Sequence, residues 1–200
     1  MIHTTGKVVG VNGNMVTVQA DGNVSMNEVA FILVGEKRLK AEVIRIRGSR
    51  AEVQVFEMTR GIGIGDSVEF TGELLSVRLG PGLLSKIFDG LQNPLPELAA
   101  KAGFFLERGL YLSPLEEDRN WAFTPTITIG SVVTAADTLG TVPEGIFAHR
   151  IMVPFTMTGR YTVKKVAAAG SYTINETIAE LEDADGNVIP VTMAFEWPVK

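Results

Sequence analysis

The feature that most constrains the fold is a series of short apolar–polar alternations within the first 72 residues. In Ala51–Phe56, for example, the apolar Val53 and Val55 alternate with polar residues. Strict alternation is typical of a half-buried strand, because successive side chains point to opposite faces. Strands are predicted at Lys7–Val11, Met15–Ala20, Glu28–Val34, Leu39–Ile46, Ala51–Phe56 and Ser67–Phe70. Six short strands at this spacing predict a small closed barrel, since closure removes exposed strand edges.

The composition supports a turn-rich β protein. Hydrophobic residues make up 46% of the chain and charged residues 20%, alongside 21 glycines and 9 prolines. There is no cysteine, which excludes disulfides, zinc–cysteine sites and thiol catalysis. The net charge of −5 argues against a nucleic-acid partner, because phosphate contacts need excess positive charge. The segment Met1–Thr5 lacks the pattern of a signal peptide, and no run approaches the roughly 20 apolar residues of a membrane helix, so no direct membrane insertion is expected.

Residues 73–112 change character and predict a connector. Apolar residues recur at helical spacing over Leu83–Leu91, which predicts a short helix ended by Gly90 and Pro94. A second short helix is predicted over Pro96–Lys101. We expect part of this apolar surface to lack cover within the chain and the connector to be mobile or covered by a neighbouring copy. The residues concerned are Leu84, Ile87, Phe88 and Leu91.

Residues 113–195 predict a second β module that contains a weak internal repeat. The segment 130–139 resembles 170–178, forty residues later, with one residue deleted. Each copy has a glycine-led turn, a strand, a polar turn and an apolar strand, and two such halves can build a flattened sandwich of the biotinyl/lipoyl type. Asp183–Asn187 is typical of a hairpin turn. Core residues are expected at Val53, Val55 and Phe70 in the first module and at Val133, Leu139, Val163 and Ile178 in the second.

The glycine-rich run Gly61–Asp66 is the first candidate for chemistry. Its spacing differs from that of dinucleotide-binding loops, and Ser67–Phe70 after it predicts a strand, which favours a structural turn over a phosphate cradle. The chain contains no G-x-x-x-x-G-K-[ST] motif and therefore no P-loop. Another candidate is a basic stretch that lacks interleaved aromatic residues and is interpreted as solvated, edge-protecting charge. It consists of Lys37, Arg38, Lys40, Arg45, Arg47 and Arg50.

The sequence gives little support for a metal site or for covalent catalysis. The two histidines, His3 and His149, have no histidine partner at ligand spacing, and the acidic turn Glu116–Asp118 lacks the pattern of a calcium loop. Ser85 and Ser113 lie outside any nucleophile elbow, and no acidic partner for His149 is evident. No catalytic, cofactor-binding or metal-binding residue is therefore predicted in this chain.

The repeat leaves a carrier function open. Biotinyl and lipoyl domains carry a lysine at the tip of the hairpin that joins their halves. We predict this junction at Val142–Arg150, which contains no lysine, whereas Lys164 and Lys165 lie inside the second half. A carrier-like module fused to a barrel remains the alternative function, although it is disfavoured by the missing attachment site.

One segment carries a specific family resemblance. Residues 61–95, with Gly72–Glu73, Leu79–Gly82 and Phe88–Gly90 followed by Pro94–Leu95, strongly resemble the segment after the N-terminal barrel in the catalytic A subunit of vacuolar/archaeal-type rotary ATPases. His149–Pro154 with Gly159 resembles the inserted bulge, or non-homologous region, of that subunit. Trp197–Val199 resembles the end of the bulge. Asn93 departs from the basic residue that often follows Gln92, and a few extra residues precede the first strand.

The resemblance implies a mainly β fold: a barrel at 1–72, a connector at 73–112, a barrel-sandwich-like bulge at 113–195, and at 196–200 the start of a link to a nucleotide-binding domain beyond Lys200. It implies that the parent subunit binds ATP and magnesium and couples ATP hydrolysis or synthesis to proton or sodium transport. The implied partners are B subunits in an A3B3 ring and peripheral stalk subunits near the bulge. The implied location is cytoplasmic, at the membrane periphery.

Overall fold

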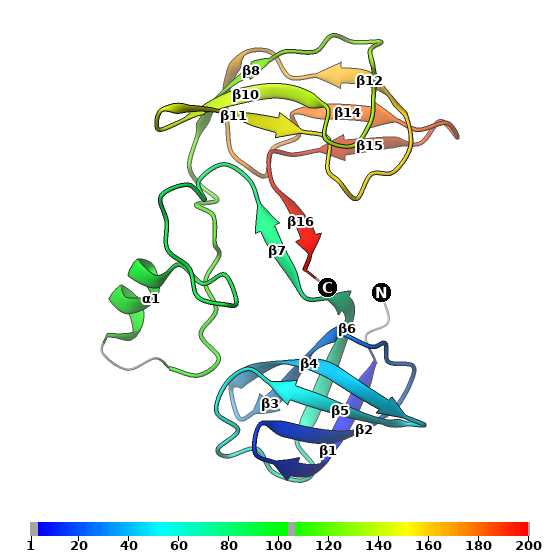
Figure 1. Cartoon of the computed structure of the whole chain (residues 1–200), viewed down its shortest axis with the longest axis vertical. Helices are drawn as coiled ribbons and strands as arrows, with labels where there is room; N and C mark the ends of the chain where they lie inside the picture. Colours follow the sequence, from blue (N-terminus) through cyan, green and yellow to red (C-terminus); the bar gives the residue numbers. More distant parts are fainter. Residues whose placement is uncertain (1–3, 104–106, 200) are drawn as a thin grey trace. The chain divides into compact units, whose positions relative to one another are not determined.

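The computed structural model describes residues 4–103 and 107–199, and Figure 1 labels the helix and most of the strands. Contacts between backbone positions divide the chain into two compact units. The first comprises the described parts of 1–76, 98–111 and 198–200, and the second comprises 77–97 and 112–197. The described part of the chain contains no helix with the length and apolar character needed to cross a membrane.

The first unit contains a closed six-stranded barrel, as the alternating runs predict. The strands follow one another around the barrel in the order β1-β2-β5-β4-β3-β6, and neighbouring strands are antiparallel. Their bounds are Thr5–Asn12 (β1), Met15–Ala20 (β2), Glu28–Val34 (β3), Lys37–Arg47 (β4), Arg50–Val55 (β5) and Ser67–Leu74 (β6). Inward side chains alternate with outward ones, and the predicted core residues Val53, Val55 and Phe70 are all buried.

The second unit contains two four-stranded sheets, β11-β10-β8-β13 and β15-β14-β12-β9, and Figure 1 labels most of their strands. The strands are Trp121–Pro125 (β8), Val132–Val133 (β9), Thr138–Glu144 (β10), Phe147–Met152 (β11), Tyr161–Val166 (β12), Gly170–Tyr172 (β13), Ala179–Glu182 (β14) and Val188–Val191 (β15). Their inner faces share one core, in which the predicted residues Val133, Leu139, Val163 and Ile178 are buried.

The internal repeat is confirmed, and each half contributes one strand to the sheet of the other half. The short strand β9 of the first half pairs with β12 of the second, and β13 of the second pairs with β8 of the first. The polar turn recurs with the same hydrogen bond, from Thr134 N to Asp137 Oδ2 at 2.7 Å and from Thr173 N to Glu176 Oε2 at 2.6 Å. The predicted hairpin turn at Asp183–Asn187 joins β14 to β15.

The strand exchange corrects the predicted junction between the halves. Each half consists of four strands, β8–β11 and β12–β15, so the connection between them is residues 153–160 and not Val142–Arg150. The segment Val142–Arg150 forms the hairpin between β10 and β11, inside the first half. The prediction failed because the repeat was recognised only from its second strand onward, which hid the equivalence of β8 and β12. Neither segment contains a lysine.

The prediction of a helix over Leu83–Leu91 is wrong. Ser85 has a φ of 64°, which interrupts an α-helix, and Phe88 pairs with Pro94 across a tight loop. The Asp89 carboxylate accepts hydrogen bonds from the amides of Leu91 and Asn93 at 2.9 and 2.8 Å. These amides therefore find a local side-chain partner in place of a helical carbonyl.

The second predicted helix exists as α1 (Leu95–Ala102). Glu97 in its first turn and Lys101 in its last turn complement the helix dipole. Gly103, with a φ of 68°, ends the helix by donating its amide to Ala99 O at 2.9 Å. Before α1, the exposed side chains of Leu84 and Ile87 agree with the expectation of uncovered apolar surface, whereas Phe88 and Leu91 are half-buried. The mobility of this connector stays a prediction.

A two-stranded ribbon joins the end of the barrel sequence to the end of the barrel-sandwich sequence. Ser76–Leu79 (β7) pairs with Phe195–Pro198 (β16). Phe155 packs edge-on against Phe195 and Trp197, with ring centroids 5.8 and 5.2 Å away. This aromatic contact ties β16 to the connection between the two halves of the sandwich.

Candidate functional site

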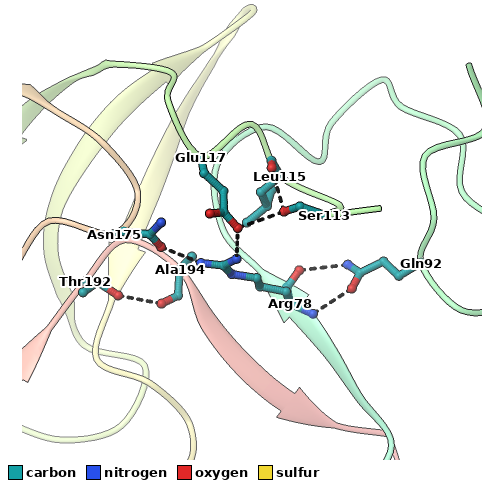
Figure 2. Close-up of polar contacts among 8 residues, drawn as sticks. All are labelled: Arg78, Gln92, Ser113, Leu115, Glu117, Asn175, Thr192 and Ala194. Carbon is teal, nitrogen blue, oxygen red and sulfur yellow. Dashed lines mark hydrogen bonds and ion pairs between the residues drawn. The ribbon is translucent and has the colours of Figure 1, made fainter. Parts of the chain in front are cut away.

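Arg78 on β7 organises a polar cluster at the base of the barrel-sandwich module, and Figure 2 shows it at the centre of that cluster. Its backbone makes a reciprocal pair with the Gln92 side chain, from Arg78 N to Gln92 Oε1 at 2.7 Å and from Gln92 Nε2 to Arg78 O at 2.8 Å. Its guanidinium donates to Glu117 Oε1 at 2.6 Å and to Asn175 Oδ1 at 2.5 Å. One side chain thus connects β7 to two segments of the module.

The partners of Arg78 show what the cluster holds in place. Asn175 lies in the repeated polar turn of the second half, and Glu117 lies in the acidic turn that precedes β8. Hydrogen bonds from Arg78 and Ser113, together with the charge of Arg78, lower the pKa of Glu117 below its usual value. Glu117 therefore stays ionised at neutral pH. The cluster therefore holds the barrel-sandwich module against β7.

A second polar contact holds the turn Leu79–Gly82. Glu144, at the end of β10, is buried, and its Oε1 accepts hydrogen bonds from Gly82 N at 2.7 Å and Leu84 N at 3.1 Å. Its other oxygen, Oε2, lies 2.5 Å from His149 Nδ1 on β11. A buried carboxylate needs such donors, because an unpaired one is strongly unfavourable. The backbone amides and the imidazole provide them.

The glycines of this turn allow the close packing. A Cβ added to Gly80 would lie 3.0 Å from Ala194 Cβ and 3.1 Å from Leu115 Cδ1. Gly82 has a φ of 108°, a conformation that residues with a side chain rarely adopt. The Leu79–Gly82 motif is therefore a structural turn that the buried carboxylate of Glu144 and a close-packed core both require.

Replacement of Glu144 by alanine should destabilise the second unit by about 2–4 kcal/mol, since it leaves the amide of Gly82 and the side chain of His149 without their partner. Urea unfolding followed by tryptophan fluorescence measures the change, because Trp121 is in the core of this unit. The matched control is Glu180→Ala, which removes a carboxylate from an ion pair with the exposed Lys165. Its cost should stay below about 1 kcal/mol. Equal losses for both variants would contradict a buried anchor at Glu144.

The first unit has a polar anchor of its own, centred on Glu57. Gly109 N donates to Glu57 Oε2 at 2.7 Å, and the Tyr111 hydroxyl donates to the other oxygen. The same hydroxyl accepts a hydrogen bond from Lys40 N at 2.7 Å, and the Tyr111 ring meets Phe31 edge-on. The segment Gly109–Tyr111 thereby packs against the barrel. Sequence reasoning treated this segment as connector and missed the contact.

Replacement of Tyr111 by phenylalanine should reduce the stability of the first unit by about 1–2 kcal/mol at neutral pH. Burial, and then the hydrogen bond to Glu57, raise the pKa of Tyr111 well above its ordinary value of 10. The folded state thus binds the phenolic proton more tightly than the unfolded state does. The stabilisation is present below about pH 10 and is lost as the pH rises further. Urea midpoints measured between neutral pH and pH 11 should fall less steeply for Tyr111→Phe than for the wild type; parallel curves would contradict this.

The candidates singled out in the sequence are mostly structural. Gly61 and Gly65 have φ values of 90° and 96°, and Gly63 N donates to Asp66 Oδ2 at 2.8 Å, so Gly61–Asp66 is the predicted turn before a strand. Ser85 is exposed at a strained position, and Ser113 Oγ contacts Leu115 O. His3 lies outside the described residues.

The structure corrects one statement about His149, which does have an acidic partner in Glu144. The pair was missed because the two residues face each other only when β10 and β11 form their hairpin. Glu116 and Glu117 form ion pairs with Lys86 and Arg78. Within residues 4–103 and 107–199, no cluster of three or more His, Asp or Glu side chains is placed to hold a metal ion.

The basic stretch splits into two parts. Arg38 pairs with Glu69 at 2.7 Å and covers the Phe31 ring at 4.4 Å from its centroid. The other part lies next to the turn between β4 and β5 and consists of Arg45, Arg47 and Arg50. Because the barrel is closed, these strands have no open edge to protect. Most of these side chains are exposed, which agrees with the predicted solvated charge, but the edge-protecting part of that interpretation is wrong.

Comparisons with known proteins agree with this architecture. The ATP synthase alpha/beta family beta-barrel domain matches residues 8–72, and the ATP synthase alpha/beta subunit barrel-sandwich domain matches residues 112–200. The two compact units thus contain the domains that begin a subunit of the ATP synthase alpha/beta class.

Individual relatives narrow the class. A V-type ATP synthase alpha chain of Treponema denticola is 60% identical over 200 residues, covering 100% of this chain and 34% of the relative. V-type ATP synthase alpha chain 1 of Treponema pallidum is 56% identical over 200 residues, again covering 100% and 34%. The alpha chain of Borreliella burgdorferi is 55% identical over 199 residues, covering 100% and 35%. The chain belongs to the V-type ATP synthase alpha-chain family and corresponds to its N-terminal portion. It spans about a third of the length of these relatives.

Proposed function

We propose that this chain is the part of a catalytic rotary-ATPase subunit that builds and holds the assembly, and that the chemistry lies elsewhere in the parent subunit. The observation that carries the proposal is identity of 55–60% along the whole chain to V-type ATP synthase alpha chains. The parent subunit couples ATP hydrolysis or synthesis to proton or sodium transport. It binds ATP and magnesium through residues outside this chain.

The structural features support a mechanical function. The barrel offers a rigid, edge-free body, and Arg78 and Glu144 fix the barrel-sandwich module to its base through contacts that span long sequence separations. In the proposed assembly, the barrel holds a ring of alternating A and B subunits together. The barrel-sandwich module contacts the peripheral stalks. The parent is cytoplasmic and peripheral to the membrane.

The carrier function is not favoured. The hairpin Val142–Arg150 and the connection at 153–160 both lack a lysine, so neither can hold a biotinyl or lipoyl group by the usual amide bond. All the relatives named above are ATP synthase alpha chains. A covalent lysine modification found by mass spectrometry would revive the carrier function.

The purified chain should not hydrolyse ATP, because it contains no P-loop to hold the phosphates. Phosphate release from an ATPase-free preparation should equal the no-protein background, whereas the parent complex should turn over. Activity that a substitution within this chain abolishes would contradict the proposal.

Assembly provides the positive test. The parent subunit without residues 1–72 should fail to form a ring with B subunits in native mass spectrometry, whereas the intact parent should form one. A deletion variant that assembles normally would show that the barrel does not hold the ring. The encoding gene offers an independent check, since it should encode a P-loop after Lys200.

A further inference from the structure

The turn between β4 and β5 places two arginines directly opposite each other. Arg47 and Arg50 are cross-strand partners at the turn formed by Gly48 and Ser49, and both are exposed. Like charges in directly opposed positions destabilise a strand pair. The fold therefore gains nothing from this arrangement, and its presence calls for a different explanation.

The charge of this pair is not neutralised within the described residues. Arg45 pairs with Glu52 at 3.5 Å, but Arg47 and Arg50 form no ion pair and no side-chain hydrogen bond there. Asp21 follows Ala20, whose amide donates to Ser49 O at 2.8 Å, yet the Asp21 carboxylate accepts a hydrogen bond from Thr5 Oγ1 at 2.9 Å. Other exposed cations, Arg160 among them, also lack a described ion pair, so the distinguishing feature of Arg47 and Arg50 is that their charges lie directly opposite each other.

A small hollow lies beside Arg50 and the turn residues Gly48 and Ser49. Its volume is about 100 Å³, and its polar lining comes from Asn23, Ser49 and Arg50, each able to donate a hydrogen bond. Since a water molecule occupies about 30 Å³ in the liquid, the hollow has room for a carboxylate group. No aromatic side chain lines it, so the stacking platform of a nucleic-acid site is missing.

We propose that this surface, the arginine tip formed by Arg47, Arg50 and the adjacent hollow, binds a carboxylate of a neighbouring subunit. Guanidinium groups match carboxylates through paired hydrogen bonds, and the pairing removes the repulsion between the opposed arginines. The partner is a polypeptide segment with exposed Asp or Glu residues. The inference rests on the proposed function, because it requires that the parent be part of a multisubunit assembly.

Zero-length cross-linking in the assembled complex tests the contact. Arg47→Lys and Arg50→Lys keep the charge and introduce an amine that a carbodiimide couples only to a touching carboxylate. We expect a cross-link from position 47 or 50 to an Asp or Glu of another kind of subunit, identified by mass spectrometry. Arg160→Lys, at an exposed site without a described ion pair, is the matched control and should give no comparable product.

Charge reversal provides a second readout. The double variant Arg47→Glu/Arg50→Glu should weaken assembly at least about tenfold, an effect that disappears when salt rises to about 1 M and screens the charges. The double variant Arg160→Glu/Arg60→Glu carries the same charge change at exposed residues that are not part of the tip and should assemble normally. Thermal unfolding must first show that both variants are folded.

The outcomes separate the two proposals. If the wild-type parent forms no multisubunit complex, the proposed function fails. If the complex forms but the tip gives no cross-link and charge reversal has no effect, the arginine tip alone is refuted. Cross-links only between copies of this chain, or displacement of the contact by inorganic phosphate at low millimolar concentration, would also overturn the assignment to a partner carboxylate.

Discussion

Replacement of Phe70 by alanine should lower the free energy of unfolding of the first unit by about 3–5 kcal/mol. Phe70 lies on β6 with 0% exposure, and its ring is among the largest fully buried side chains of the barrel core. Its removal forfeits the transfer energy of an aromatic ring and leaves a cavity that a closed barrel cannot collapse to fill. Because typical domains are stable by only about 5–15 kcal/mol, such a loss should bring the unit close to unfolding at 37 °C.

Urea denaturation followed by far-UV circular dichroism measures this loss. Ile64→Ala is the control, since Ile64 is 79% exposed in the loop before β6. That variant should change stability by no more than about 0.5 kcal/mol. A small effect of Phe70→Ala would mean that the barrel interior repacks freely and is not the closed core described above.

Replacement of Gly140 by alanine should destabilise the second unit by about 3 kcal/mol, at the upper end of the usual cost of overpacking. An added Cβ would lie 2.3 Å from Phe123 Cε2 and 2.7 Å from the backbone oxygen of Thr124. Phe123 is itself 1% exposed in the core, so its ring has little room to retreat. The backbone oxygen cannot move without disturbing the pairing of β10 with β8.

Gly10→Ala is the matched control for this substitution. Gly10 also follows a register shift within a strand, but the nearest atoms to an added Cβ there lie at 3.8 Å, an ordinary contact distance. That variant should be neutral or slightly stabilising, since alanine restricts the unfolded chain more than glycine does. Equal behaviour of the two variants in thermal unfolding would contradict a steric reason for glycine at position 140.

The barrel could be predicted from the sequence because its signals are local. Alternation over a few residues predicts each strand, and glycine, asparagine or aspartate predicts each turn. The prediction of six strands was accurate to within about two residues at most ends, except that β6 continues four residues further, to Leu74. The repeat was also visible, since its polar turn needs an acidic side chain three residues after a threonine in both copies.

The helix predicted over Leu83–Leu91 shows where local signals mislead. Apolar residues at helical spacing are compatible with helix, but they do not require it. The amides of Leu91 and Asn93 bind the Asp89 side chain, and Asn93 Oδ1 accepts a further hydrogen bond from Leu112 N at 2.9 Å. A tertiary contact to a residue nineteen positions away thereby helps to hold the loop.

The sequence by itself determined the class of fold, the strand positions in the barrel, the repeat and the family. Only the tertiary structure decided the exchange of strands between the halves and the anchors at Arg78 and Glu144. The physical reason is distance along the chain: Arg78 and Asn175 are 97 residues apart, and Gly82 and Glu144 are 62 apart. Periodicity reports which face of a strand is buried. It carries no information on which distant polar group will complete a buried hydrogen bond, because that depends on how whole sheets pack.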